Sequence, residues 1–300
     1  MAKYAPSGKV GGAGIVMSLG FGLVAGAVCA VAFHFVGRLF YLVLLFPAVW
    51  GLVIGAATAA GVRTGKCRNG AVGLVAGLVA AVASFGIFQM LENRHVHSAV
   101  LEAVGKEAAL PKDVDVYDEF LQQKHGGTGF MAHLSARAEM GMNISRAGRG
   151  GKDSKPMISG AGMYVYWFIE LGIIAGICGL MALGAAREPF CETCVVWYEK
   201  AELAGIVPAK IDEARRAIAA KDYARLPSYV VRTNPGGALS EEKCPTCAEA
   251  PVVVKLEAIT VDKKGKEERR TIYEDLIPAD EARKIESAIA GPATPAAGAT

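Results

Sequence analysis

The chain has 300 residues, of which 52% are hydrophobic and 36 are glycine, and its mean hydropathy is +0.32. This composition excludes an ordinary soluble protein. The net charge is only +3, and residues 186–300 hold 17 Lys/Arg against 19 Asp/Glu. We expect no nucleic-acid partner, because nucleic-acid binding needs a basic face.

Four apolar runs occur in chain order, at about residues 13–36, 39–61, 70–90 and 162–184. Each is close to the roughly 20 residues that cross a bilayer, and none contains Lys, Arg or Asp. They also lack the polar face that a core helix of a soluble protein presents. The sequence therefore predicts a mainly α membrane protein with a four-helix transmembrane bundle in contact with lipid.

Each predicted span carries two glycines four residues apart. Such a pair leaves a flat strip on which the backbone of another helix can approach closely. We expect the spans to pack together through these strips, and the pattern leaves further oligomerisation open. The pairs are Gly22/Gly26, Gly51/Gly55, Gly73/Gly77 and Gly172/Gly176.

Basic residues near the spans predict the orientation. The short loop at 62–69 carries Arg63, Lys66 and Arg68, and Lys3 and Lys9 precede the first span. Short loops rich in Lys and Arg stay in the cytoplasm, so we expect both termini on the cytoplasmic side of the cell (inner) membrane. Basic residues at 146–155 oppose this assignment, but they lie in a loop of about 70 residues, where the rule is weak.

The loop at 91–161 is expected to be extracytoplasmic and partly helical. Apolar residues recur every four positions from Val96, and a second helix is predicted from 130 to about 142. A Gly-rich basic linker follows at 145–156. Four histidines of this loop show no metal-ligand spacing, and we interpret them as separate surface residues. They are His95, His97, His125 and His133.

Glu170 is the only carboxylate in the four runs. It lies about eight residues into the fourth span, roughly 10 Å deep, where a carboxylate needs a partner or a protein-lined environment. His34 and Arg38 lie at the same end of the first helix hairpin, so we predict a Glu170–Arg38 or Glu170–His34 contact. The alternative is that Glu170 handles protons or ions.

The clearest chemistry is in Cys191-Glu-Thr-Cys194 and Cys244-Pro-Thr-Cys247. Two residues between cysteines allow both sulfurs to bind one ion, and two such pairs form a closed tetrahedral S₄ site. We therefore expect residues 185–290 to form a cytoplasmic metal-binding domain with zinc. Iron in the same site and thiol–disulfide exchange are the alternatives.

The flanks of the second cysteine pair alternate like strands, at 251–261 and 270–276. Strands that leave a cysteine turn in this way resemble a zinc ribbon, so we expect a small α+β zinc-ribbon-like domain. Helices are predicted at about 209–224 and 279–290, before a disordered tail at 291–300. Zinc is expected to take the place of a hydrophobic core in this domain.

The sequence contains no Walker loop, nucleophile elbow or His-Glu-x-x-His motif. We therefore expect a non-enzymatic integral membrane protein whose zinc domain acts as an interaction module for a protein partner. The alternative is a membrane redox or transport component that uses the cysteine pairs or Glu170.

Overall fold

The computed structural model describes residues 3–37, 44–108, 115–143, 157–231, 236–262 and 265–290. The chain divides into two compact units. One is Val10–Ala186, and the other combines Met1–Lys9 with Arg187–Thr300. Arg38, the linker at 145–156 and the tail at 291–300 all lie outside the described residues.

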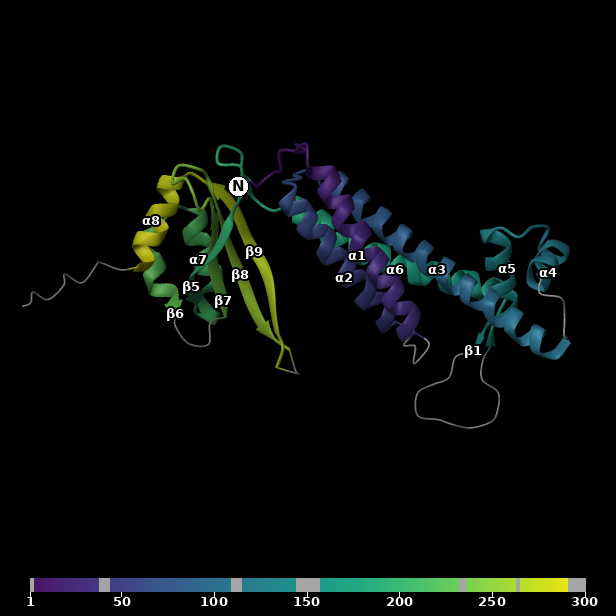
Figure 1. Cartoon of the computed structure of the whole chain (residues 1–300). Coiled ribbons are helices and arrows are strands. Elements are labelled where there is room, and N and C mark those ends of the chain that lie inside the picture. Colours follow the sequence, from purple (N-terminus) through teal and green to yellow (C-terminus); the bar gives the residue numbers. More distant parts are fainter. Residues whose placement is uncertain are drawn as a thin grey trace, which may run out of the picture. The chain divides into compact units, whose positions relative to one another are not determined.

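Among the described residues, four long helices form a bundle in the first unit (Figure 1). All four are long and apolar enough to cross a membrane. Helix α1 packs against α2 and α3, and α6 packs against the same two, so α1 and α6 occupy opposite corners. This confirms the four-helix membrane fold. The helices are α1 (Gly14–Val36), α2 (Leu45–Thr64), α3 (Gly70–Ala108) and α6 (Ala161–Ala186).

Helix α3 does not end with its apolar part. It runs unbroken for 39 residues, roughly 58 Å at 1.5 Å per residue. Helices α4 (Val116–His125) and α5 (Phe130–Met140) pack on its far end, around the buried Tyr117 and Leu121. The helix predicted from residue 130 is α5, whereas α4 was not foreseen. Two short strands, β1 (Met142–Asn143) and β2 (Met157–Ile158), pair antiparallel before α6.

Glycines set the distances between the bundle helices. A Cβ on Gly77 would lie 2.7 Å from the carbonyl oxygen of Cys178, and one on Gly73 would lie 2.7 Å from that of Ala182. No side chain fits in such a space. A Cβ would also come within 3.1 Å of another helix at Gly22, Gly26, Gly51 and Gly55.

The Gly172/Gly176 pair behaves differently from the other three. A Cβ at either position would meet nothing within 4 Å. The packed face of α6 carries Ile174 and Cys178 instead, and residues two positions away lie on the opposite side of a helix. In this bundle the packing role expected of the pair is therefore wrong.

The C-terminal unit contains a five-stranded antiparallel sheet in the order β6-β5-β7-β8-β9. The two strands predicted after the second cysteine pair are present as β8 and β9, whereas β5, β6 and β7 were not foreseen. A separate two-stranded hairpin, β3–β4, lies at the first cysteine pair. The strands are β3 (Phe190–Cys191), β4 (Val196–Trp197), β5 (Glu199–Ile206), β6 (Val230–Val231), β7 (Gly237–Lys243), β8 (Val252–Val261) and β9 (Glu267–Ile277).

The helix predicted at 209–224 is instead three shorter pieces, and Lys221, in a left-handed conformation with φ 59°, separates the second piece from the third. These pieces are the short 3-10 helix η1 (Pro208–Lys210), α7 (Ile211–Ala219) and the 3-10 helix η2 (Tyr223–Tyr229). The final helix, α8 (Ala279–Ala290), has the predicted bounds.

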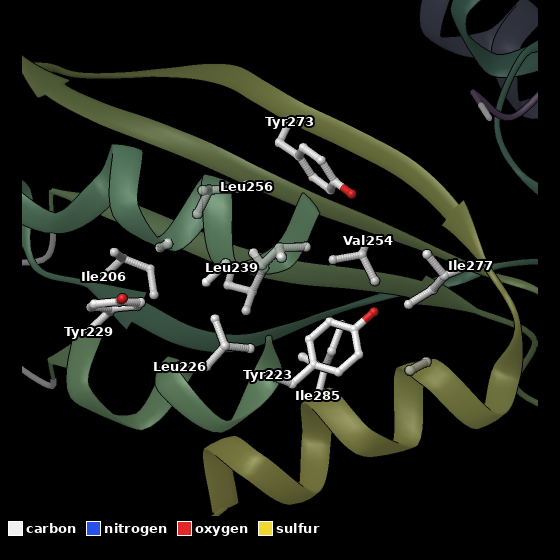
Figure 2. Close-up of a cluster of buried hydrophobic side chains, with 14 of the residues drawn as sticks. Ile206, Tyr223, Leu226, Tyr229, Leu239, Val254, Leu256, Tyr273, Ile277 and Ile285 are labelled. Carbon is white, nitrogen blue, oxygen red and sulfur yellow. The ribbon is translucent and has the colours of Figure 1, made fainter. Parts of the chain in front are cut away.

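These helices bury a substantial core against the sheet. Figure 2 shows Leu226 from η2 and Ile285 from α8 beside strand residues such as Leu239. All three are fully buried. The expectation that zinc replaces a hydrophobic core was therefore wrong. The core was missed because β5 and β7, which supply part of it, were not recognised as strands.

Candidate metal centre

The first cysteine pair lies in the turn of the β3–β4 hairpin. Cys191 pairs with Val196, and Phe190 pairs with Trp197, whose ring meets that of Phe190 edge-on at 4.9 Å. Val195, directly after the pair, has φ 57°. This is the left-handed conformation that favours glycine, so a β-branched residue occupies the position where a cysteine turn usually has glycine.

The second pair lies beyond the end of β7, and its local geometry repeats that of the first. The backbone N–H groups of Thr246 and Cys247 each donate to the Cys244 sulfur at 3.4 Å. In the first turn the N–H groups of Thr193 and Cys194 act on Cys191 in the same way. Amides that donate to sulfur stabilise its thiolate form, which is the form that binds metal.

The fold brings all four sulfurs together. Their Sγ atoms lie within 4.8 Å of one another, and those of Cys191 and Cys247 are 3.7 Å apart. When four sulfurs surround a zinc ion tetrahedrally at about 2.3 Å, neighbouring sulfurs are roughly 3.8 Å apart. The two sulfurs of a disulfide are only about 2.05 Å apart. All seven cysteines of the chain are free. The cluster therefore has the dimensions of a tetrahedral S₄ site.

The proton affinities of the thiols show why the cluster suits a cation. Burial raises the pKa of Cys244, but the amides of Cys247 and Thr246 and the neighbouring thiols outweigh this effect and lower it to about 7. For Cys194, mainly the neighbouring Cys247 thiol raises the pKa to about 12. Without a cation, Cys194 therefore keeps its proton while Cys244 loses its proton most readily, and a bound dication would favour the thiolate form of both.

No protein-family model, curated protein or solved structure matches the chain. Its capacity to bind metal therefore rests on its own residues.

A charged network around the buried Glu241, missed at the sequence level, connects the second turn to α8. Glu241 on β7 is 1% exposed, and Lys243 Nζ lies 2.6 Å from it and 2.7 Å from Glu286 of α8. Burial raises the pKa of Glu241, while the Lys243 hydrogen bond lowers that of Glu286. Arg283 of α8 also donates to the carbonyl oxygen of Ala248 at 3.2 Å. The network holds the turn on the sheet–helix layer beside a cavity of about 300 Å³.

The N-terminal segment is part of the same unit, which the sequence did not suggest. The Tyr4 hydroxyl accepts from the N–H of Phe190 at 3.1 Å, and Lys9 Nζ lies 3.4 Å from Glu192. Tyr4 also lines a cavity of about 480 Å³ with Phe190, Tyr198 and Cys191. No local sequence pattern connects residues so far apart in the chain.

The described contacts of the polar residues in the spans leave the predicted Glu170–Arg38 or Glu170–His34 contact untested. Glu170 is buried, and the Tyr166 hydroxyl donates to it at 2.8 Å from one turn earlier in α6. His34 is also buried and its Nδ1 lies 2.6 Å from Glu92 of α3. Arg38 lies outside the described residues, so a contact between it and Glu170 stays a prediction. The role of Glu170 remains a prediction.

The interpretation of the four loop histidines as separate surface residues is wrong for His97. Its Nε2 lies 2.8 Å from Asp115 and, together with Asp118, these side chains place three ligand atoms within 4.8 Å of one another. The contact depends on the packing of α4 against α3, and the sequence does not specify that packing.

Proposed function

We propose that the chain is a non-enzymatic multi-pass membrane protein whose four clustered cysteines bind a structural zinc ion. Its C-terminal unit binds a protein partner on the cytoplasmic side of the membrane. The observation that carries the proposal is the cluster itself, in which four free sulfurs from two turns approach one another at the distances of a ZnS₄ site.

The position of the cluster supports a structural role. Zinc joins the β3–β4 hairpin to the turn between β7 and β8, two segments that otherwise lie at the margin of the hydrophobic core. All four coordination positions are taken by cysteine, so none is left for a substrate or a water molecule. Both Cys-x-x-Cys pairs contribute to one cluster, which favours metal binding over two independent thiol–disulfide sites.

The metal is tested on the full chain, purified in detergent without added metal and dialysed against a weak chelator. We expect one zinc per chain, and none in Cys244→Ser. Cys67→Ser is the matched control, because Cys67 is also buried but lies in the membrane unit. Iron in place of zinc would favour the electron-transfer alternative. Absence of metal together with two disulfides would overturn the proposal.

The partner-binding role is supported by the aromatic cavity beside the cluster. Tyr and Phe are enriched at the centres of protein interfaces, and this cavity is lined by Tyr4, Tyr198 and Phe190. A photo-crosslinking amino acid at Thr193, on the cavity wall, should capture a discrete partner in cells, and Cys244→Ser should abolish this adduct. The same probe at exposed Arg216 of α7 is the control. Equal capture from both positions would contradict the assignment.

The orientation is supported by the loop after α2. Val10, just before α1, forms a β-bridge with Cys67, so the start of α1 and the basic loop lie at the same end of the bundle. With both at the cytoplasmic end, exposed Ser98 in the extension of α3 lies outside. Ser98→Cys should react with a membrane-impermeant maleimide in intact cells. Reaction only after lysis would reverse the orientation.

A further inference from the structure

A second group of metal-ligating side chains lies in the helical part of the first unit, away from the cysteines. His97 comes from the extension of α3, Asp115 caps the N-terminus of α4, and Asp118 lies in the first turn of α4. His97 Nε2 is 3.0 and 2.8 Å from the two carboxylate oxygens of Asp115. One ligand atom from each of the three residues falls within 4.8 Å of the others.

Helix capping explains only part of this group. Asp115 Oδ1 accepts from the N–H of Asp118 at 3.1 Å, as an N-cap residue does. Capping does not require a second carboxylate at Asp118, nor a histidine that contacts both oxygens of the cap.

Unpaired polar atoms beside the group are an independent observation. Tyr117 is 3% exposed, and its hydroxyl has no hydrogen-bond partner among the described residues. Its ring lies 5.3 Å from that of His97 and 5.4 Å from that of His133. The buried Nδ1 of His133 likewise has no hydrogen-bond partner in the described part of the chain.

Leaving such a group unpaired costs about 1–3 kcal/mol, so two of them in one place call for an explanation. The rings of His97 and His133 are 6.2 Å apart. A cation on the His97 side with a coordinated water would provide hydrogen-bonding capacity for Tyr117 and His133.

We propose that His97, Asp115 and Asp118 bind a divalent transition-metal cation, with His133 and Tyr117 hydrogen-bonding to its water ligands. Imidazole together with carboxylate suits manganese, iron or zinc better than magnesium or calcium. Three protein ligands leave coordination positions for water. The side chains of His97 and Asp115 are 30% and 38% exposed, so the ion exchanges with solvent, unlike one in the cysteine cluster.

The proposal is tested by titrating the full chain in detergent with Mn²⁺, followed by electron paramagnetic resonance. Thiolates select softer metals, so Mn²⁺ reports on the His/Asp group and not on the cysteines. We expect one Mn²⁺ per chain, displaced by Zn²⁺ and not by an equal concentration of Mg²⁺. Asp115→Asn should weaken binding at least about tenfold. Asparagine caps helices as well as aspartate does, so α4 remains folded.

Glu119→Gln is the matched control, because Glu119 is an exposed neighbour of Asp118 and the substitution removes the same charge. It should change the Mn²⁺ affinity less than about twofold, because screening by solvent weakens an exposed charge. His97→Gln should abolish Mn²⁺ binding while the helical circular dichroism is unchanged. Absence of Mn²⁺ binding below millimolar concentration would overturn the proposal. Equal weakening by Glu119→Gln and Asp115→Asn would also overturn it, since it would indicate only a diffuse attraction between charges.

Discussion

The two units of this protein achieve close packing in opposite ways. The membrane unit brings its helices together where side chains are missing, as at Gly73 and Gly77 against the backbone of α6. The C-terminal unit fills the space between the sheet and the helices with large side chains, such as Leu239 and Leu256. The solvent explains the difference. Water drives apolar side chains together, whereas lipid tails are as apolar as leucine and leave backbone proximity as the main source of contact.

The two units should therefore be sensitive to different kinds of substitution. Removing side-chain volume should harm the C-terminal unit, and adding volume should harm the bundle. Single substitutions, each with a control in the same unit, test this contrast.

The largest effect is expected for Leu256→Ala. Leu256 is fully buried in the core of the C-terminal unit, so the substitution leaves a cavity and should lower the free energy of unfolding by roughly 2–5 kcal/mol. Hydrogen exchange of the sheet amides measures this loss. Val261→Ala on the same strand is the control, because Val261 is 63% exposed. A similar loss in both variants would show that the core does not hold this unit together.

Gly77→Val should destabilise the bundle by roughly 1–3 kcal/mol, because the added Cβ collides with the backbone of α6 and the helices must separate. Thermal unfolding of the full chain in detergent measures the effect. Gly176→Val adds the same volume where nothing lies within 4 Å, and its melting temperature should match that of the wild type. Equal loss from both substitutions would contradict the role of the close approach between Gly77 and α6, because valine has a better helix propensity than glycine at both positions.

Val195→Gly should act in the opposite direction and stabilise the C-terminal unit. The left-handed conformation of Val195 costs roughly 1–2 kcal/mol, which glycine avoids at the expense of some unfolded-state entropy. We expect a net gain of roughly 1 kcal/mol and slower loss of zinc to a chelator. Val196→Gly, in the paired strand β4, should be destabilising. Faster zinc release from the Val195 variant would contradict the strain assigned to this turn.

The smallest effect is expected for Ser84→Ala in the bundle. The Ser84 hydroxyl donates to the carbonyl oxygen of Gly26 at 2.6 Å and accepts from the indole of Trp50 at 2.9 Å, so it connects α3 to α1 and α2. Interhelical hydrogen bonds in membranes contribute about 0.6 kcal/mol on average. The melting temperature in detergent should fall slightly, and a loss as large as that of Gly77→Val would show that polar contacts matter more here than glycine packing.

The sequence predicted features that depend on local composition or spacing. Uniform apolarity identified the four spans, the two Cys-x-x-Cys pairs identified the cluster, and alternation identified β8. Strand β5 was missed because Glu199-Lys-Ala-Glu-Leu has charged and small residues where an alternating strand has large apolar ones. This segment forms a strand because it pairs with β7, and its own sequence does not indicate that pairing.

Features that depend on distant parts of the chain could not be predicted. His97 and Asp115 meet because α4 folds back on α3, and Tyr4 meets Phe190 across 186 positions. The Gly172/Gly176 pair shows the opposite error. Its two glycines have the same spacing as the other pairs. Which face of α6 is covered by other helices depends on how the helices pack, and the spacing does not reveal this.

Because α3 is a single unbroken helix, a tilt of its apolar part would also move the part beyond it. Leu101 lies eleven residues beyond Met90 on the same helix, roughly 16 Å along its axis. A tilt of about 10° at Met90 would therefore displace Leu101 by about 3 Å, as a rigid arm does. Helix tilt responds to bilayer thickness. Because α3 has no break between Met90 and Leu101, a tilt caused by the membrane would also move His97, one turn before Leu101.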